Sequence, residues 1–550
     1  MAKKNTGNAA KSAFRINKLI VYPVSLVMLA VIIISFINQK MFATIMSGLM
    51  NGFVNNFKWI VGPTILLMII TGIIMYAHPI GKIRLGGVNA KPKFSNFSYW
   101  GLCICSTIAT GIVFYGVVQP LTFFEQPWAG WGKPESTSAA VHALAENNLE
   151  WAWGQYIAYT IWAIVLGIAI HNLRQPTKVS SFLFVFTGKE VKKGWNIFVD
   201  LLTIIGIIAG VTCSLGTGTM QMSAGLNQVF GIDVNRILWL IVEAVVVIGF
   251  LLMSVGGIAK GIKVVTDQNF NLYIIVLIVM ALFGPTLYIF DMFVQSTGLT
   301  ANNFISMLTY DGGTDGNKAV ISWQIWQFVS CACFAPITGL FLAKVSYGRT
   351  VREVVTGVWI VPSLFNCVWF VVFGSIAFDM QKNGTFDLWA SLQKEGMEAT
   401  MFEMFKQFPF GTVLCVVFLV VIYLSFVTLA SSATTTASYA SMITVRDVRE
   451  DEEPPMYMKT YWALIMAACA YVMISYAGID GAKSFATIGG LPTIVMEFMA
   501  GMAVYRIPKV LHRYADKKTL RIGEALGDTF SEEEMAKLAE EQETLVSAQQ

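Results

Sequence analysis

The chain has 550 residues, of which 55% are hydrophobic and only 13% are charged, and its mean hydropathy is +0.61. A soluble fold cannot bury that much apolar surface, so this composition excludes an ordinary soluble protein. The formal net charge of +4 is small for so long a chain, and we expect no nucleic-acid partner.

Apolar runs of about 20 residues recur along the chain, and a helix of that length crosses the hydrocarbon core of a bilayer. We therefore predict an all-α integral membrane protein with twelve transmembrane helices. The predicted spans are 19–38, 58–77, 98–118, 153–171, 197–222, 236–256, 271–293, 322–343, 355–378, 411–443, 461–479 and 484–505.

The positions of Lys and Arg predict the orientation. With both termini in the cytoplasm, most of the 38 basic residues fall in cytoplasmic segments, as the positive-inside rule requires. The loops 119–152 and 379–410, which would then lie outside, are rich in Asp and Glu.

The two ends of the chain are polar and flank one transmembrane domain. We expect residues 1–18 to be a cytoplasmic segment without fixed structure, 19–505 to be the transmembrane domain and 506–550 to be a cytoplasmic tail. The first apolar run lacks a cleavage pattern and predicts a retained span. The basic start of the tail can contact anionic lipid, and a capping box at Ser531 predicts a short helix over 532–545.

Three predicted spans carry Gly, Ser and Thr at their centres, in the stretches 106–116, 211–221 and 425–441. Such residues can simply allow close helix packing. They can also mark unwound helices, which membranes tolerate only where the backbone is buried in protein or lines a cavity. Several in one chain predict a transporter with a site near the bilayer midplane.

All eight cysteines lie inside predicted spans, and two of them occur in the stretch FVSCACF. Cys331 and Cys333 point about 200° apart on a helix, so they cannot hold one ion together. The four histidines are not spaced as ligands with them. We therefore expect no metal and no cofactor.

Trp326, Ser330 and Phe334 recur at helical spacing and should share one face, next to Pro336, which can kink the helix. Such an aromatic face can hold an organic cation by cation–π attraction, although it can equally be a packing surface. Further rings follow in the predicted span 153–171, at Trp153, Tyr156, Tyr159 and Trp162.

Several long motifs resemble those of the betaine/choline/carnitine transporter (BCCT) family, in order and over most of residues 15–505. They are SYGRTVREVVTGVWIVPSLFNCVWFVVFGSIA (346–377), TGIVFYGVVQPLTFF (110–124), VTCSLGTGTMQMSAGLNQVFG (211–231) and AKGIKVVTDQNFNLYIIVLIVMALFGPT (259–286).

The resemblance implies a secondary active transporter of quaternary ammonium compounds or related methylated zwitterions, of the glycine betaine, carnitine or choline type, working by alternating access. It also implies two inverted five-helix repeats, here about 98–293 and 322–505, in a homotrimer in the inner (plasma) membrane of a bacterium. The motifs would place the substrate in an aromatic box. Its residues here would be Ala109, Thr110, Gly111, Tyr159, Trp162, Phe328, Ser330, Cys331 and Phe334, with Trp326 as a partial substitute for missing rings.

This chain also departs from the family pattern. Ser330, Cys331 and Phe334 stand where betaine-binding members usually have tryptophan, which leaves the identity of the substrate open. A bulkier ligand would suit the extra room, and a substrate/product exchanger for a different methylated amine is the alternative.

The coupling ion is open as well, between sodium and a proton. Alkyl side chains at Ile207, Val211 and Leu429 replace hydroxyl positions of sodium-driven members, and alkyl groups cannot ligate sodium. The usual Glu of the third span is Gln119 here. Residues that could still serve coupling are Thr428, Ser431, Thr212, Ser214 and the intramembrane acid Glu243, with Glu497 as a second such acid.

Two other classes compete with a transporter. An osmosensing channel or receptor would need a ring of pore charges or a large signalling domain, and the sequence suggests neither. A membrane enzyme would need a catalytic cluster, which four scattered histidines do not favour. The chain has no GxxxxGK[ST] loop for ATP, so we expect a transporter rather than an enzyme.

Overall fold

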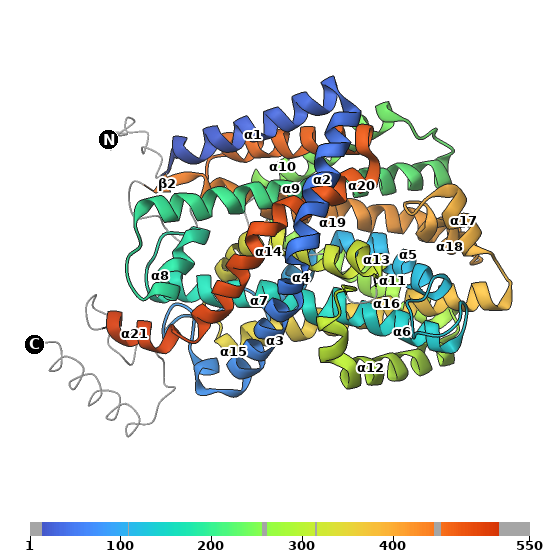
Figure 1. Cartoon of the computed structure of the whole chain (residues 1–550), viewed down its shortest axis with the longest axis horizontal. Helices are drawn as coiled ribbons and strands as arrows, with labels where there is room; N and C mark the ends of the chain where they lie inside the picture. The colour runs from blue at the N-terminus through green and yellow to red at the C-terminus, as the bar shows by residue number, and fades with distance from the viewer. Residues whose placement is uncertain (1–13, 108, 256–260, 314–315, 445–452, 516–550) are drawn as a thin grey trace, which may run out of the picture.

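The structure is a computed structural model that describes residues 14–107, 109–255, 261–313, 316–444 and 453–515. The described part is almost entirely helical, with long helices packed side by side (Figure 1).

The first half of the chain begins with one short strand. Its elements are β1 (Phe14–Ile16), α1 (Lys18–Ile37), α2 (Gln39–Phe57), α3 (Val61–Ala77), α4 (Asn96–Cys105), α5 (Ala109–Glu125), α6 (Thr137–Asn148), the π-helix η3 (Leu149–Trp153), α7 (Gly154–Gly167), the π-helix η4 (Ile168–Asn172), α8 (Phe182–Thr187), α9 (Lys193–Phe230), α10 (Arg236–Val255) and α11 (Lys263–Phe283).

The second half contains the longest helix. Its elements are α12 (Thr286–Thr309), α13 (Lys318–Val320), the π-helix η7 (Ile321–Ile325), α14 (Trp326–Val345), α15 (Val351–Val354), the π-helix η8 (Val355–Ile360), α16 (Val361–Asn383), α17 (Leu388–Glu395), α18 (Thr400–Lys406), α19 (Gly411–Ala440), β2 (Met442–Thr444), α20 (Met456–Val504) and α21 (Ile507–Ala515).

Ten helical segments of the described residues are long and apolar enough to cross a membrane. The predicted span 98–118 is not among them, because α4 ends at Cys105 and α5 starts at Ala109. The two predicted spans 461–479 and 484–505 form the single element α20, which is interrupted by the non-helical backbone of Gly478 (φ 62°, ψ −159°). A positive φ is accessible to glycine at little cost.

Only one of the three predicted interruptions is present in the described residues, the one between α4 and α5. The stretch 211–221 lies in the unbroken α9, and 425–440 lies in the unbroken α19, so these two predictions are wrong. The hydroxyls of Thr217, Thr428 and Thr434 donate to carbonyls one turn earlier, so these polar groups are satisfied inside an intact helix.

The helices differ in how deeply they are buried. The most apolar window of 318–345 is 94% buried and that of 137–172 is 89% buried, whereas those of 18–37 and 263–283 are only 33% buried. In a membrane protein the outer helices can present apolar side chains to lipid. Helices α7 and α14 therefore form the centre of the molecule, and α1 and α11 belong to its periphery.

The segment before α1 is ordered from Phe14 onward. Strand β1 pairs antiparallel with β2, and the ring of Phe14 packs on Tyr439 with the centroids 5.8 Å apart. The expectation that residues 1–18 lack fixed structure is therefore wrong for Phe14–Ile16 and for Lys18, the first residue of α1. Residues 1–13 and the predicted helix 532–545 lie outside the described residues.

The motif that follows α14 is anchored to an earlier loop. The guanidinium of Arg349 donates to Asn96 and to the carbonyl of Phe94, and it stacks over the ring of Tyr99 at 3.9 Å. Thr350 and Glu353 form a capping box that starts α15. These contacts fix the end of α14 against α4.

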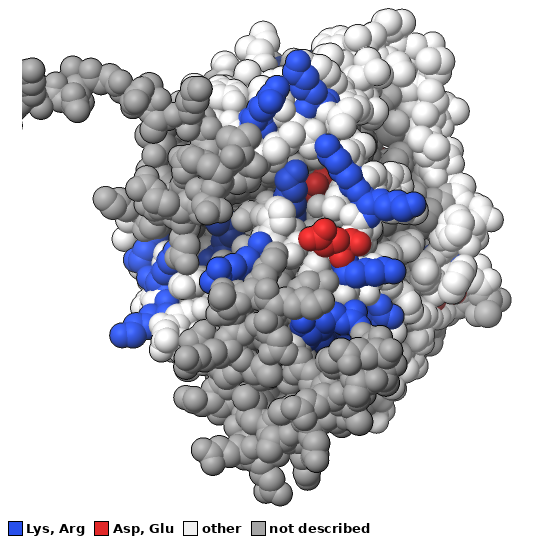
Figure 2. All heavy atoms as spheres, turned by 90° about the vertical axis from the view of Figure 1, so that its left-hand side faces the viewer, with Lys and Arg blue, Asp and Glu red and all other residues white. Residues whose placement is uncertain are grey.

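One face of the molecule carries α8, β2 and α21 (Figure 1). Lys and Arg side chains gather on this face, with few acidic ones between them (Figure 2). Arg506 and Arg513 donate to backbone carbonyls at Phe186 and Gly188, so α21 is held against α8.

Candidate functional site

A small cavity of about 50 Å³ lies where α5, η3, α7, α9, α14 and α20 meet. It has room for a few water molecules, so a larger solute would enter only if side chains move. The lining residues are Thr107, Gly111, Phe114, Tyr115, Trp151, Tyr159, Cys213, Ser214, Thr217, Trp326, Gln327, Ser330, Cys331, Phe334 and Ala486.

Helix α14 gives one face to the cavity. Trp326, Ser330 and Phe334 all line it, as their spacing of four residues requires, and Cys331 joins them. Ser330 and Cys331 are small, so space remains between the larger rings at either end of this face.

The two neighbouring cysteines of α14 point to different helices. The thiol of Cys331 lies 3.7 Å from the carbonyl oxygen of Gln155 in α7, while the thiol of Cys333 lies 2.6 Å from that of Ala486 in α20. Among the described residues there is no cluster of His, Cys, Asp and Glu that could hold a metal ion. Small side chains at these positions allow α14 to approach both of its neighbours closely.

A chain of hydrogen bonds fixes the wall between α7 and α14. Gln327 donates to the side-chain oxygen of Gln155 at 2.8 Å, and Gln155 donates to the hydroxyl of Tyr159 at 3.2 Å. All three side chains are buried, so the ring of Tyr159 is held in one position at the cavity.

A second polar network holds the rings from α5 and η3. The indole of Trp151 donates to Gln119 at 2.6 Å, and Gln119 in turn donates to Glu150 at 2.5 Å. The ring of Trp151 then packs against Tyr115 with the centroids 5.2 Å apart. Gln119 therefore positions a ring of the cavity.

Three polar groups at the cavity have no hydrogen-bond partner within the described part of the chain. They are the hydroxyl of Tyr115, the indole nitrogen of Trp326 and the hydroxyl of Ser330. Buried polar groups are rarely left unpaired in proteins. These groups can therefore serve a bound solute.

Other predicted binding residues do not line this cavity. Trp162 packs edge-on against Phe182 at 5.0 Å, and Phe328 packs against the backbone of Gly154. Ala109 and Thr110 begin α5, but their side chains lie outside the described ones.

The residues expected to serve ion coupling are spread over three helices. Ser214 lines the cavity, and Thr212 is buried in α9 with an unpartnered hydroxyl among the described residues. The hydroxyl of Thr428 bonds within α19, and that of Ser431 lies 2.7 Å from Ser254. Glu243 is buried in α10, and within the described residues neither of its carboxyl oxygens has a partner.

Several lining residues were not selected from the sequence. Tyr115 lies within the quoted motif TGIVFYG, and Trp151 stands two residues before the predicted span 153–171. Both are rings in apolar surroundings and could have been candidates on that ground. The other unselected lining residues are Thr107, Phe114, Cys213, Thr217, Gln327 and Ala486.

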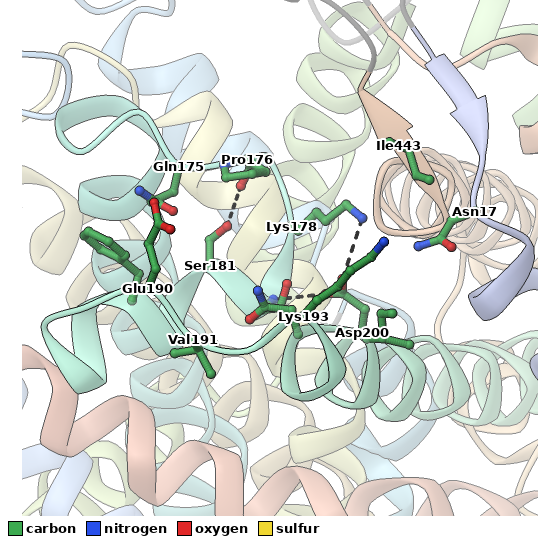
Figure 3. Close-up of a pocket in the computed structure, with 14 residues that line it drawn as sticks. Asn17, Gln175, Pro176, Lys178, Ser181, Glu190, Val191, Lys193, Asp200 and Ile443 are labelled. Carbon is green, nitrogen blue, oxygen red and sulfur yellow. Dashed lines mark hydrogen bonds and ion pairs between the residues drawn. The ribbon is translucent and has the colours of Figure 1, made fainter.

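A larger pocket of about 370 Å³ opens between the loop before α8 and the start of α9 (Figure 3). Lys178 points at Asp200, 3.8 Å away, and the backbone of Ser180 donates to the same carboxylate. Its charged centre is thus already paired, and its lining shares no residue with the central cavity. We regard the central cavity as the candidate functional site.

Comparison with known proteins assigns the chain to a family of membrane transporters. Residues 19–513 match the model of the betaine/carnitine/choline family transporters, BCCT. The chain belongs to this family, and it is a transporter and not an enzyme.

Relatives with described functions share about a quarter of their residues with it. The glycine betaine transporter OpuD of Bacillus subtilis is 29% identical over 78% of this chain and 82% of its own length. A glycine betaine transporter of Acinetobacter baylyi is 27% identical over 86% and 70%. An ectoine/hydroxyectoine transporter of Virgibacillus pantothenticus is 27% identical over 88% and 95%.

Among solved structures, the chain aligns with a Na⁺-coupled sialic acid symporter at a TM-score of 0.41 and 15% identity. The alignment covers 83% of this chain and 87% of the symporter. A likeness of this size is too weak to establish a shared fold.

Proposed function

We propose that the protein is a secondary active transporter of quaternary ammonium compounds or related methylated zwitterions, which binds its substrate in the central cavity. The observation that carries this proposal is the convergence of the rings of Tyr115, Trp151, Tyr159 and Trp326 on that cavity. Aromatic faces attract methylated ammonium groups, at about 0.5–2 kcal/mol per ring. The names of the glycine betaine and ectoine relatives support the same substrate class.

The arrangement in the membrane is part of this proposal. Counting α4 with α5 as one broken span and α20 as two spans separated at Gly478 would give the twelve spans and the inverted repeats 98–293 and 322–505. The basic face that carries α8 and α21 would lie in the cytoplasm with both termini (Figure 2). We further propose a homotrimer in a bacterial inner membrane, with the domain 19–505 as the transporting unit.

For coupling, we propose that a sodium site of the usual kind is absent. Ile207 and Val211 offer no oxygen ligands, and the hydroxyl of Thr428 is used inside its own helix. Transport would then be driven by a proton that is carried on Glu243 or by the exchange of one substrate for another. The buried carboxyl group of Glu243, with no partner among the described residues, supports the first alternative.

The test is binding to the purified full-length protein in nanodiscs by isothermal titration calorimetry. The ligands are glycine betaine, carnitine, choline, proline betaine and ectoine, each with and without sodium. We expect sodium-independent binding of at least one methylated zwitterion. Binding that requires sodium would overturn the coupling proposal, and binding of none of the ligands would overturn the substrate class.

A further inference from the structure

Lys483 of α20 places a positive charge against the rings of the cavity. Its ammonium nitrogen lies 4.3 Å from the ring centre of Trp326, 4.6 Å from that of Trp323 and 5.3 Å from that of Tyr115. These rings come from α14, η7 and α5, so elements far apart in the sequence converge on one cation. Each distance is within the range of cation–π attraction.

The ammonium of Lys483 is held by rings and not by an anion. In the part of the chain that the structure describes, it forms no ion pair and no hydrogen bond. Among the described residues, the carboxyl groups of Glu150 and Asp480 are near it but form no ion pair with it. Glu150 is instead engaged by Gln119, and Asp480 is exposed. The three N–H donors of the ammonium therefore remain unused by these residues.

Lys483 is not itself a lining residue of the cavity, but two of the rings that it contacts are. Tyr115 and Trp326 line the cavity, and Trp323 packs on Tyr115 with the centroids 6.2 Å apart. The unpartnered groups of the cavity wall are also able to donate, namely the hydroxyls of Tyr115 and Ser330 and the indole N–H of Trp326. This end of the cavity thus offers an excess of donors, and the positive charge of Lys483 lies against two of its rings.

We propose that Lys483 recognises the carboxylate of the transported solute and discriminates against simple cations. The inference rests on the proposed function, and it narrows the substrate class to zwitterions that carry both a carboxylate and a methylated ammonium group. A carboxylate accepts hydrogen bonds and donates none, so it matches Lys483, Tyr115 and Ser330. The ammonium group of the same solute would lie toward the rings of Trp151 and Tyr159.

A cationic solute without a carboxylate would be repelled by Lys483. Its positive charge would compete with Lys483 for the faces of Tyr115 and Trp326, and like charges at close range repel each other. Choline carries the same trimethylammonium group as glycine betaine but a hydroxyl in place of the carboxylate. The two compounds therefore separate the contribution of Lys483 from that of the rings.

The experiment measures the affinities of glycine betaine and choline for the full-length protein in nanodiscs by calorimetry. The variant is Lys483→Met, which keeps an unbranched apolar stem but removes the charge. The control is Lys394→Met, because Lys394 is 82% exposed and pairs only with its neighbour Glu395 among the described residues. Thermal unfolding of each variant reports whether it is folded.

We expect the wild type to prefer glycine betaine. Lys483→Met should lose about 10- to 100-fold in glycine betaine affinity, the range for a hydrogen bond to a charged group, and should bind choline equally well or better. If Lys483→Met is folded and the ratio of the two affinities is unchanged, the role of Lys483 is rejected. The proposed function is not affected by that outcome. A wild type that binds neither compound would reject the proposed function and this inference with it.

A second measurement needs no variant. The methyl ester of glycine betaine keeps the trimethylammonium group and the carbonyl but has no negative charge and carries one additional methyl group. We expect the wild type to bind the ester at least about tenfold more weakly than glycine betaine. Equal binding of the two would overturn the proposal even if Lys483→Met does not fold.

Discussion

Two regions along η7 and α14 are built from different kinds of side chain. Around Trp326 and Trp323, aromatic side chains from three elements enclose the ammonium of Lys483 at 4.3–5.3 Å. We call this the aromatic end. Around Cys333, α14 meets α9 and α20 through glycine and cysteine, and we call this the close-packed end.

At the close-packed end, the backbones themselves approach each other. A Cβ atom added to Gly489 would lie 2.6 Å from Cβ of Ala209 and 3.4 Å from the thiol of Cys333. One added to Gly490 would collide with the carbonyl oxygen of Val329. Helices in membranes associate tightly where such small residues meet.

The comparison teaches that one helix can divide its tasks along its length. At the aromatic end, large rings line the cavity and contact a cation. At the close-packed end, small residues let the helix backbones approach each other. Substitutions at the close-packed end should therefore affect stability, and those at the aromatic end should affect binding.

The largest effect is expected at the close-packed end, from Gly490→Ala. Because the new methyl group would meet backbone atoms of Val329 that cannot rotate away, α14 and α20 must separate. Overpacking of this kind costs up to about 3 kcal/mol. The midpoint of thermal unfolding should fall clearly.

The control for this substitution is Gly298→Ala in α12, where nothing lies within 4 Å of the added Cβ. It should leave the midpoint unchanged or raise it slightly, since alanine favours a helix over glycine by about 1 kcal/mol. Equal effects of the two substitutions would contradict the close packing of α14 and α20.

The next effect concerns the support of the aromatic end, through Gln119→Leu. This change leaves the indole of Trp151 and the carboxylate of Glu150 without their partner, at a cost of about 2 kcal/mol. We expect weaker binding of glycine betaine together with a modest loss of stability, measured by calorimetry and thermal unfolding. Gln407→Leu is the control, because Gln407 is exposed and, among the described residues, its side chain bonds only the carbonyl of Glu403 in the preceding turn.

A ring of the aromatic end is removed by Trp326→Leu. The ring that holds the ammonium of Lys483 at 4.3 Å is lost, which should weaken glycine betaine binding by about 2- to 30-fold, and the space left by the smaller buried leucine should also lower the unfolding midpoint. Trp195→Leu removes an indole that is 60% exposed and should leave binding intact. If unfolding changes and binding does not, the ring has a packing role only.

The smallest effect concerns Glu125, at the end of α5 and beyond the predicted span 98–118. Partial burial, together with the negative charges of Glu135 and Asp387, raises the pKa of Glu125 to about 7. A raised carboxyl pKa means that the folded state binds the proton more tightly than the unfolded state. Stability therefore falls as the pH rises from about 4.5 to about 7, and this loss is complete above that range.

Glu125→Gln removes this titration. Between pH 5 and pH 8 the unfolding midpoint of the variant should fall less than that of the wild type. The control is Glu190→Gln in the loop after α8, which also removes one carboxylate. Its unfolding midpoint should depend on pH as that of the wild type does. A steeper dependence in Glu125→Gln would show that the sign is wrong.

Much of this picture follows from local patterns in the sequence. Apolar runs predict most of the long helices, and spacing by four residues places Trp326, Ser330 and Phe334 on one face. The separation of Cys331 and Cys333 onto opposite neighbours follows from the same geometry. In contrast, Trp162 shares a span with Tyr159 but packs against Phe182, because ring content alone does not tell which side of a buried helix faces a cavity.

The predicted interruptions failed for a related reason. Glycine and hydroxyl residues at 211–221 and 425–440 can unwind a helix or pack it closely, and composition is the same in both cases. In α9, a Cβ on Gly216 would lie 2.6 Å from the side chain of Ile474 in α20, so the glycine serves contact between helices. Only the neighbouring helix decides between these outcomes.

The sequence by itself determined the class of protein, because hydropathy and ordered motifs are properties of the chain and need no knowledge of its contacts. Tertiary structure alone decided that Lys483 meets Trp323, Trp326 and Tyr115. Lys483 is far from these rings in the chain, as Tyr115 is from the two tryptophans, and no periodicity relates positions on different helices. Packing of the helices brings them together. Helix α20 is interrupted at Gly478, and Lys483, in the part of α20 that follows, contacts the rings of α5, η7 and α14.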